Sequence, residues 1–160
     1  MDQIARQVVS NLKNKTTSPD TGVEFSDLTA GIFPDLDSAV DAAFAAQKNL
    51  MELSLEKREE IIASIRKKML QFSEELATDA VTETGLGRFE DKIEKNRLVT
   101  TKTPGTEDLL TGAKSGDRGL TIYERAPYGV IGAITPSTNP TSTIICNTIG
   151  MVAAGNSVVF

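Results

Sequence analysis

The segment from Tyr128 to Phe160 constrains the fold most, because its residue pattern orders a strand, a loop, a helix and a second strand. Its first strand is a short apolar run around one glycine, made of Val130, Ile131, Gly132, Ala133 and Ile134. Such a run suits a strand that is buried on both faces of a parallel sheet. The run ends at Thr135 and Pro136, where we expect the chain to turn.

Two signals bound the helix that follows this turn. Asn139 and Pro140 predict its start, since Asn is a good N-cap and proline at the first helical position loses no hydrogen bond. Gly155 and Asn156 predict a left-handed end, and Ser157 then begins a second buried strand. The sequence therefore predicts one βαβ unit of an α/β fold.

Residues Thr135 to Thr141 form the candidate site of this unit. Their loop leaves the carboxyl end of a strand, which is where open α/β sheets bind ligands, and the helix beyond it presents free N–H groups. The alternative is an ordinary connecting loop in which Thr138 and Asn139 only start the helix. The residue types alone do not decide between these two interpretations.

The ordered blocks around this loop carry a family resemblance. They read GIFPDLDSAVDAAFAAQ, TETGLGRFEDKIEKN, TPG at Thr103 to Gly105, GLTIYERAP and ERAPYGVIGAITPSTNPTSTIICNTIGMVAAGNSVVF. Together they cover most of residues 31–160. This set resembles the aldehyde dehydrogenase superfamily, in particular the coenzyme A-acylating acetaldehyde and propionaldehyde dehydrogenases of ethanolamine and propanediol utilisation.

The resemblance implies the N-terminal part of the aldehyde dehydrogenase fold. We expect helices, a β-ribbon and the first βαβ unit of a parallel, Rossmann-like sheet, preceded by a tethered amphipathic helix. Residues 31–160 would be the N-terminal part of the dinucleotide-binding domain. Because Phe160 ends an apolar strand just after a first βαβ unit, we expect the 160 residues to be an N-terminal piece, either a shortened sequence or a real fragment.

Composition excludes several classes of function. The net charge is −5, there is no basic stripe and aromatic residues make up only 5%, which disfavours nucleic-acid binding. No run of about 18 apolar residues and no signal peptide are present, so we expect a cytoplasmic protein without a membrane partner. One cysteine and no histidine exclude a disulfide framework, the usual zinc clusters and a Cys-His or Ser-His pair within these residues, and we expect no metal.

Residues 1–18 predict a short amphipathic helix on a linker that spans residues 19–30. The apolar stripe contains Ile4, Ala5, Val8, Val9 and Leu12. A helix of this length is marginal alone, so it suits a docking peptide that folds in the groove of a partner. The alternative is a helix that packs on its own domain. The resemblance favours docking, because enzymes of this branch carry such a helix for encapsulation by shell proteins of a bacterial microcompartment.

Apolar periodicity predicts three further helical regions between residues 31 and 104. The first is capped near Asp35 or Asp37 and lined by Val40, Ala43, Phe44, Gln47 and Leu50. The second opens at Ser54, has a possible break near Ser73 and stops at Gly85, and the third follows Arg88 with Phe89 and Ile93 inward. We expect the charged side chains of the second region to be solvated, namely Glu56, Arg58, Glu59, Arg66, Lys67 and Lys68.

Residues 105–127 predict a β-hairpin or two-stranded ribbon. The apolar segments Leu109–Leu110 and Gly119–Ala126 bracket residues 112–118, which are rich in Gly, Ser and Asp. In the resembled family this region contributes to subunit contacts. We therefore expect a homo-oligomer when the enzyme is full length.

The single thiol, Cys146, is interpreted as structural. It lies mid-helix in the apolar run TSTIICNTIG, whereas a reactive thiolate needs a helix N-terminus, a cation or a base. In the resembled enzymes the nucleophilic cysteine lies beyond Phe160. No GxGxxG fingerprint is present either, since Gly129 and Gly132 form only a GxxG within the strand.

The resemblance assigns roles to the loop. Thr135, Pro136, Ser137 and Thr138 would border the nicotinamide end of NAD. In many aldehyde dehydrogenases an asparagine of this loop donates its amide to the oxyanion. Alignment at the first proline places Thr138 there rather than Asn139, so both remain candidates, and Asn139 has N-capping as an alternative role.

The implied reaction converts a short aliphatic aldehyde, NAD and coenzyme A to acyl-CoA and NADH. We expect the 160-residue chain alone to be inactive, because it lacks the nucleophile. Two other interpretations compete. One is another branch of the superfamily, such as a semialdehyde dehydrogenase or a bifunctional aldehyde-alcohol dehydrogenase, and the other is a non-catalytic targeting or assembly module.

Overall fold

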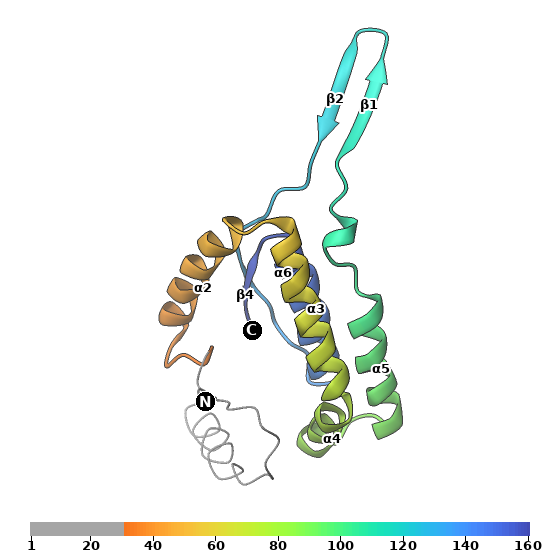
Figure 1. Cartoon of the computed structure of the whole chain (residues 1–160). Coiled ribbons are helices and arrows are strands. Elements are labelled where there is room, and N and C mark those ends of the chain that lie inside the picture. Colours follow the sequence, from red (N-terminus) through yellow and green to blue (C-terminus); the bar gives the residue numbers. More distant parts are fainter. Residues whose placement is uncertain (1–30) are drawn as a thin grey trace. The chain divides into compact units, whose positions relative to one another are not determined.

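The computed structural model describes residues 31–160, which follow the predicted order of helices, ribbon and βαβ unit (Figure 1). The elements are α2 (Leu36–Met51), α3 (Leu55–Gln71), α4 (Ser73–Thr84), α5 (Phe89–Lys102), the 3-10 turn η1 (Thr106–Asp108), β1 (Gly112–Gly116), β2 (Gly119–Tyr123), β3 (Val130–Gly132), α6 (Pro140–Ala153) and β4 (Ser157–Val159). The expected helix at residues 1–18 and linker at 19–30 lie outside the described residues. The domain limits stay a prediction.

Side-chain caps begin two of the helices where the sequence predicted them. The carboxylate of Asp35 accepts a hydrogen bond from the backbone N–H of Ser38 at 2.8 Å, and the hydroxyl of Ser54 accepts one from that of Lys57 at 3.1 Å. The predicted break falls at Phe72, which separates α3 from α4. The caps at Asp35 and Ser54 are confirmed, and each satisfies a backbone group that the first turn leaves unpaired, whereas no side chain caps α4.

The predicted βαβ unit is confirmed. β3 and β4 pair in parallel, with Ile131 opposite Val158, and α6 connects them. Gly155 follows α6 at φ 83°, a left-handed conformation that glycine adopts without strain. Its neighbour Asn156 is buried, and its side-chain oxygen accepts hydrogen bonds from the backbone N–H groups of two residues that lead into β3. This side chain therefore connects the start of β3 to the start of β4.

The expectation of fully buried strands was wrong. β3 ends at Gly132, and the side chain of Ile134 is 98% exposed. The residues of β4 are half-buried, and Phe160 is 49% exposed. Among the described residues this sheet has only two strands, so each strand has one neighbour and one open edge. Helices α2 and α6 pack on it and cover it only in part.

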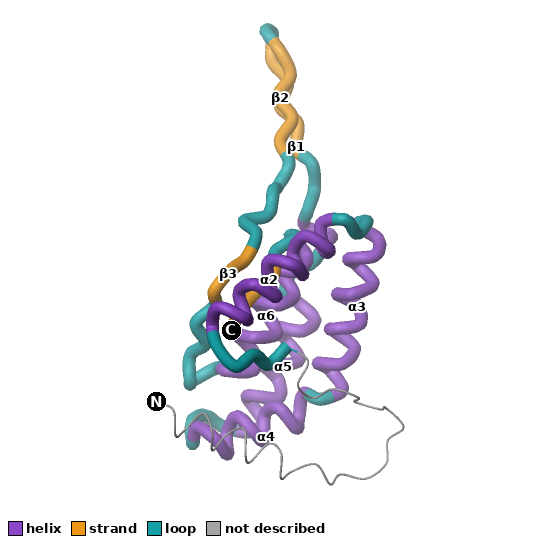
Figure 2. The backbone as a smooth tube through the Cα atoms, turned by 90° about the vertical axis from the view of Figure 1, so that its left-hand side faces the viewer, coloured by secondary structure: helices purple, strands orange, loops and turns teal. Residues whose placement is uncertain are grey.

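The core lies between α3, α5 and α6, which lie side by side in both views (Figures 1 and 2). Its centre consists of Ile62, Ile145, Ile149 and Ala153, with Ile65, Met69, Leu76, Val99 and Val152 packed around it. Two apolar side chains expected to face inward are instead exposed, namely Phe44 and Phe89. They lie on helix faces that no other described element covers.

Two arginines correct the prediction of a solvated face on α3. Arg58 is only 7% exposed, and its Nη1 donates to the carbonyl of Ala153 at 3.1 Å, at the C-terminal end of α6. Arg66 donates to the carbonyls of Thr100 and Thr103, at the end of α5. Both guanidinium groups thus supply donors to carbonyls that a helix end leaves free.

The ribbon is confirmed, with its strands shifted along the sequence. β1 and β2 pair antiparallel, with Gly112 opposite Tyr123 and the tip at residues 117 and 118. Most of the segment expected between the strands is therefore β1 itself. A Cβ on Gly112 would lie 2.0 Å from the Tyr123 ring, so this ring fills the space that the glycine leaves. The ribbon extends away from the helices, and nearly all of its residues are exposed (Figure 1).

Candidate functional site

The candidate loop lies where the sequence placed it, between the carboxyl end of β3 and the N-terminus of α6. Pro136, Ser137 and Thr138 are exposed, and Asn139 is the residue before the first helical position. The backbone N–H of Asn139 points back to the carbonyl of Pro136 at 3.4 Å, which closes a tight turn. The structure therefore brings the predicted site residues 135–139 together on one short, accessible segment.

Asn139 does not cap α6 with its side chain. No side-chain hydrogen bond caps this helix. The Oδ1 atom of Asn139 instead accepts a hydrogen bond from Nζ of Lys95 at 2.7 Å, and its Nδ2 atom lies 3.4 Å from Oγ1 of Thr138. The predicted helix start is confirmed, with Asn139 at the N-cap position, but the alternative role of side-chain capping is not, because a lysine on the neighbouring helix donates to the oxygen that a cap would use.

Helix α5 contributes polar residues that sequence reasoning missed. Nζ of Lys92 donates to the carbonyl of Thr138 at 3.0 Å, although the residue is only 7% exposed. Asn96, which is 1% exposed, accepts a hydrogen bond from the hydroxyl of Thr141 at 2.9 Å and donates to the carbonyl of Ser73 at 3.2 Å. Lys92, Lys95 and Asn96 have the spacing of one helix face. The one available signal was their place within the block TETGLGRFEDKIEKN.

The loop presents a polar wall with free backbone donors. The first turn of α6 contains no acidic residue, and without a side-chain cap its N–H groups remain available. The hydroxyl of Thr135 is buried and has no hydrogen-bond partner among the described residues. An exposed backbone beside uncapped helix N–H groups suits a polar or anionic ligand. The residues present therefore fit the polar part of a cofactor.

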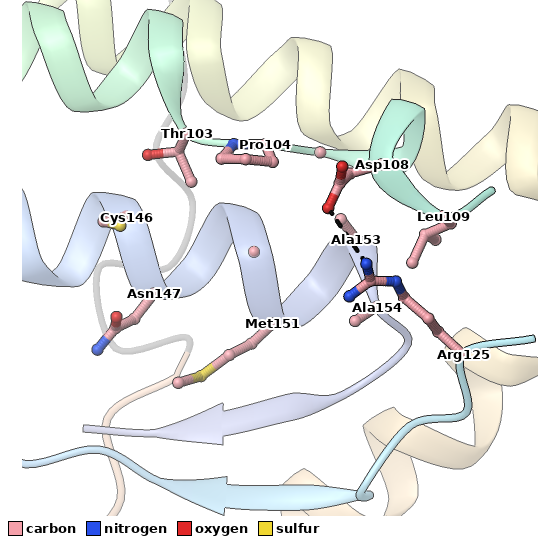
Figure 3. Close-up of a pocket in the computed structure, with 12 residues that line it drawn as sticks. Thr103, Pro104, Asp108, Leu109, Arg125, Cys146, Asn147, Met151, Ala153 and Ala154 are labelled. Carbon is pink, nitrogen blue, oxygen red and sulfur yellow. Dashed lines mark ion pairs between the residues drawn. The ribbon is translucent and has the colours of Figure 1, made fainter.

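Cys146 lies away from this loop. It is partly buried on α6, seven residues and thus about 10 Å along the axis beyond Asn139. It borders a pocket of about 350 Å³ (Figure 3). Figure 3 shows Asn147 and Met151 of α6 on one side of the pocket and Thr103 and Pro104 on another. An ion pair between Asp108 and Arg125, at 4.0 Å, also lines the pocket. The structural role of Cys146 stays a prediction.

Within residues 31–160 no helix is both long and apolar enough to cross a membrane. In the same part of the chain, no three His, Cys, Asp or Glu side chains gather as a metal site would require.

Comparison with known proteins identifies the class. The aldehyde dehydrogenase family matches residues 8–160, so the chain belongs to that family. It is 54% identical over 130 residues to acetaldehyde dehydrogenase (acetylating) of Bilophila wadsworthia, a match that covers 81% of this chain and 26% of the relative. It is 42% identical over its whole length to acetaldehyde dehydrogenase (acetylating) of Escherichia coli, of which it covers 33%.

The solved structures agree. A propionaldehyde dehydrogenase from the fucose utilisation bacterial microcompartment of Clostridium phytofermentans superposes with a TM-score of 0.77 at 58% identity, covering 81% of this chain and 30% of that one. The predicted resemblance to the CoA-acylating members is thereby confirmed. The chain spans only about a quarter to a third of the relatives that it matches.

Proposed function

We propose that this chain forms the N-terminal part of an NAD-dependent, CoA-acylating aldehyde dehydrogenase for acetaldehyde or propionaldehyde. The observation that carries the proposal is the identity of 42–54% to acetylating acetaldehyde dehydrogenases, one of which is matched along the entire chain. In the whole enzyme the products would be acyl-CoA and NADH.

The loop supplies part of the wall around the cofactor. When bound, NAD provides the hydride acceptor for aldehyde oxidation. We propose that Thr135, Pro136, Ser137 and Thr138 border its nicotinamide end. Two observations support this: the last three residues are exposed, and their loop leads to the uncapped N–H groups of α6. Coenzyme A would enter as the second substrate.

The loop also offers a donor for the oxyanion that forms when a thiolate adds to an aldehyde. Lys95 donates a hydrogen bond to Oδ1 of Asn139. The two N–H groups of the Asn139 amide are then the atoms of this side chain that can donate to an oxyanion. Thr138 has an exposed hydroxyl beside it and is the second candidate. We propose Asn139 for this role. The nucleophilic thiol would come from outside these 160 residues, because Cys146 sits in the middle of α6.

A hybrid enzyme tests the function. Residues 31–160 of this chain replace the matching N-terminal portion of the Bilophila wadsworthia relative, and NADH formation is followed with acetaldehyde, propionaldehyde or succinate semialdehyde, with and without coenzyme A. We expect CoA-dependent NADH formation with the two short aldehydes and none from the 160-residue chain alone. A folded hybrid that prefers the semialdehyde would instead support another branch of the family.

For residues 1–18 we propose docking to a shell protein of a bacterial microcompartment. The apolar stripe of this segment supports it, as does the microcompartment origin of the Clostridium phytofermentans relative. Fused to a fluorescent protein, residues 1–18 should bring it to shells in a host that makes them. Val8→Asp with Leu12→Asp should abolish this by placing charge in an apolar groove. Asn11→Asp with Lys13→Asp, on the polar face, should not, and a diffuse wild-type fusion beside intact shells would contradict the proposal.

We further propose that the ribbon contacts a second subunit in the whole enzyme. Its apolar side chains are exposed, with Leu120 at 64% and Ile122 at 62%, and these two lie on one face of β2. Leu120→Asp with Ile122→Asp should reduce the assembly size of the hybrid in sedimentation experiments. An unchanged size would place the subunit contact elsewhere.

A further inference from the structure

We propose that Lys92 and Lys95 of α5 are positioning residues that hold the loop at residues 135–139 in its working geometry. Lys92 fixes the backbone of the loop, and Lys95 fixes the orientation of the Asn139 amide. The part that concerns Lys95 rests on the proposed oxyanion role of Asn139. The part that concerns the loop's geometry does not depend on any reaction.

Lys92 contacts the loop through a backbone carbonyl. Its ammonium is nearly buried and donates to the carbonyl of Thr138 at 3.0 Å. Among residues 31–160 Lys92 forms no ion pair with a carboxylate, and at 7% exposure its ammonium has little access to water. A buried cation is retained only where its donors are used. The bond therefore fixes the peptide between Thr138 and Asn139 against α5.

Lys95 determines which way the Asn139 amide faces. An ammonium group donates hydrogen bonds and cannot accept them, so the atom that faces it at 2.7 Å must be Oδ1. Nδ2 is thereby turned away from Lys95, toward the side of Thr138. Without the lysine the amide could rotate by half a turn and present its oxygen instead. An oxygen there would repel an oxyanion, whereas the nitrogen can donate to it.

Two neighbours complete this arrangement. The buried Asn96 hydrogen-bonds to Thr141 in the first turn of α6 and to the carbonyl of Ser73 at the start of α4. Gly87, at φ 81°, lies under the Lys92 side chain, where an added Cβ would come within 3.1 Å of its Cε atom. A glycine thus makes room for the lysine stem. These contacts give the block TETGLGRFEDKIEKN a function, since its residues support the loop from the side of α5.

The first test needs no catalysis. Amide hydrogen exchange of Asn139 and Thr143, whose N–H groups donate to the carbonyls of Pro136 and Asn139, is measured in the 160-residue chain and in its Lys92→Met variant, which keeps the length and helix propensity of the side chain. We expect about tenfold faster exchange at these amides, as the loss of one charge-assisted hydrogen bond implies. Lys67→Met, on the exposed face of α3, is the matched control and should change nothing. Unchanged exchange in the Lys92 variant, with its circular dichroism spectrum intact, would overturn the role of Lys92.

The second test uses the hybrid enzyme and the exposed Lys95, whose replacement leaves the core untouched. Lys95→Met should lower kcat about tenfold with KM for acetaldehyde little changed, because one donor to the transition state becomes misoriented. Lys95→Arg should restore most of the rate. In an Asn139→Ala background, Lys95→Met should have no further effect, since the lysine acts through that amide. Additive losses in the double variant would overturn its positioning role.

The two failures are distinguishable. If the hybrid with the unaltered chain is inactive with every aldehyde although the Lys92 variant exchanges faster, the proposed function fails and the loop-holding role stands. If the hybrid is active and neither lysine variant changes exchange, kcat or the double-variant cycle, the function stands and the positioning role is wrong.

Discussion

The side-chain oxygen of Asn156 accepts a hydrogen bond from the backbone N–H of Gly129 at 2.9 Å, across 27 residues of sequence. The same oxygen accepts from the N–H of Tyr128 at 2.6 Å, so one buried carboxamide orders the start of both parallel strands. Substitution of Asn156 therefore tests what holds the two strands together, since one change removes both hydrogen bonds.

Asn156→Ala should lower the free energy of unfolding by about 2–3 kcal/mol, because two backbone donors lose their buried acceptor. Asn156→Asp keeps the acceptor and should cost less, although it loses the donor to the carbonyl of Met151. Urea unfolding of the two variants measures the difference. An alanine variant as stable as the aspartate variant would contradict this account of the strand start.

Arg66→Lys should cost about 1–2 kcal/mol, because a lysine cannot place two fixed donors on the carbonyls of Thr100 and Thr103. Arg97→Lys is the control, since Arg97 makes exposed ion pairs with Glu74 and Glu94 that contribute about 0–1 kcal/mol. Thermal unfolding compares the two. Equal shifts in Tm would show that the two hydrogen bonds of the Arg66 guanidinium add no more stability than an exposed ion pair.

Cys146→Ala in the hybrid enzyme should keep the catalytic rate within a few-fold and cost roughly 1 kcal/mol of stability from a small cavity. The expected reason is that this thiol lies on α6 well beyond the loop. Single-turnover measurement of acyl-enzyme formation checks it. If the folded variant formed no acyl-enzyme, the structural assignment of the cysteine would be wrong.

Asn139→Asp separates the two roles of this residue. The aspartate still accepts from Lys95 and favours the helix N-terminus, so stability should be retained or raised. Acylation by the hybrid should nevertheless fall by about a hundredfold or more, because a carboxylate would face developing negative charge. A stable variant with full activity would move the oxyanion role to Thr138 or to backbone amides.

Asp35 should make stability depend on pH in the acid range. Hydrogen bonds from the backbone and side chain of Ser38 hold the pKa of its carboxyl below the ordinary value. A lowered folded-state pKa contributes stability above the unfolded-state pKa, and this contribution is lost as pH falls through the folded-state value. Asp35→Asn caps without titrating, so the stability advantage of the unaltered chain should disappear as pH falls through and below the ordinary range of an aspartate carboxyl. Parallel pH curves for the two proteins would refute the linkage.

Sequence reasoning located the elements because their boundaries depend on local chemistry. Asp35, Ser54 and Pro140 mark helix starts through the first turn alone, and Gly155 marks an end through its own backbone conformation. The order of strand, helix and strand follows from these marks. Local signals of this kind do not depend on what packs against the helix.

The partners of charged residues could not be predicted in this way. Polarity patterns count arginine and lysine as exposed, whereas Arg58 and Lys92 are buried to their charged ends against carbonyls of α6 and the loop before it. Long side chains reach such groups only once the helices are packed. For the same reason the sequence left the role of Asn139 open between capping and oxyanion binding, since nothing local reveals that Lys95 will lie beside it.

The contacts of α2 are expected to form late in folding. Ser157 donates to the carbonyl of Ala43 at a separation of 114 residues, and Gln47 donates to the carbonyl of Gly155 at a separation of 108. Contacts that distant in sequence form late, because a long loop must close before they stabilise anything. During synthesis on the ribosome α2 therefore emerges long before β3 and β4 exist, and the face that packs on these strands stays uncovered until they have been added.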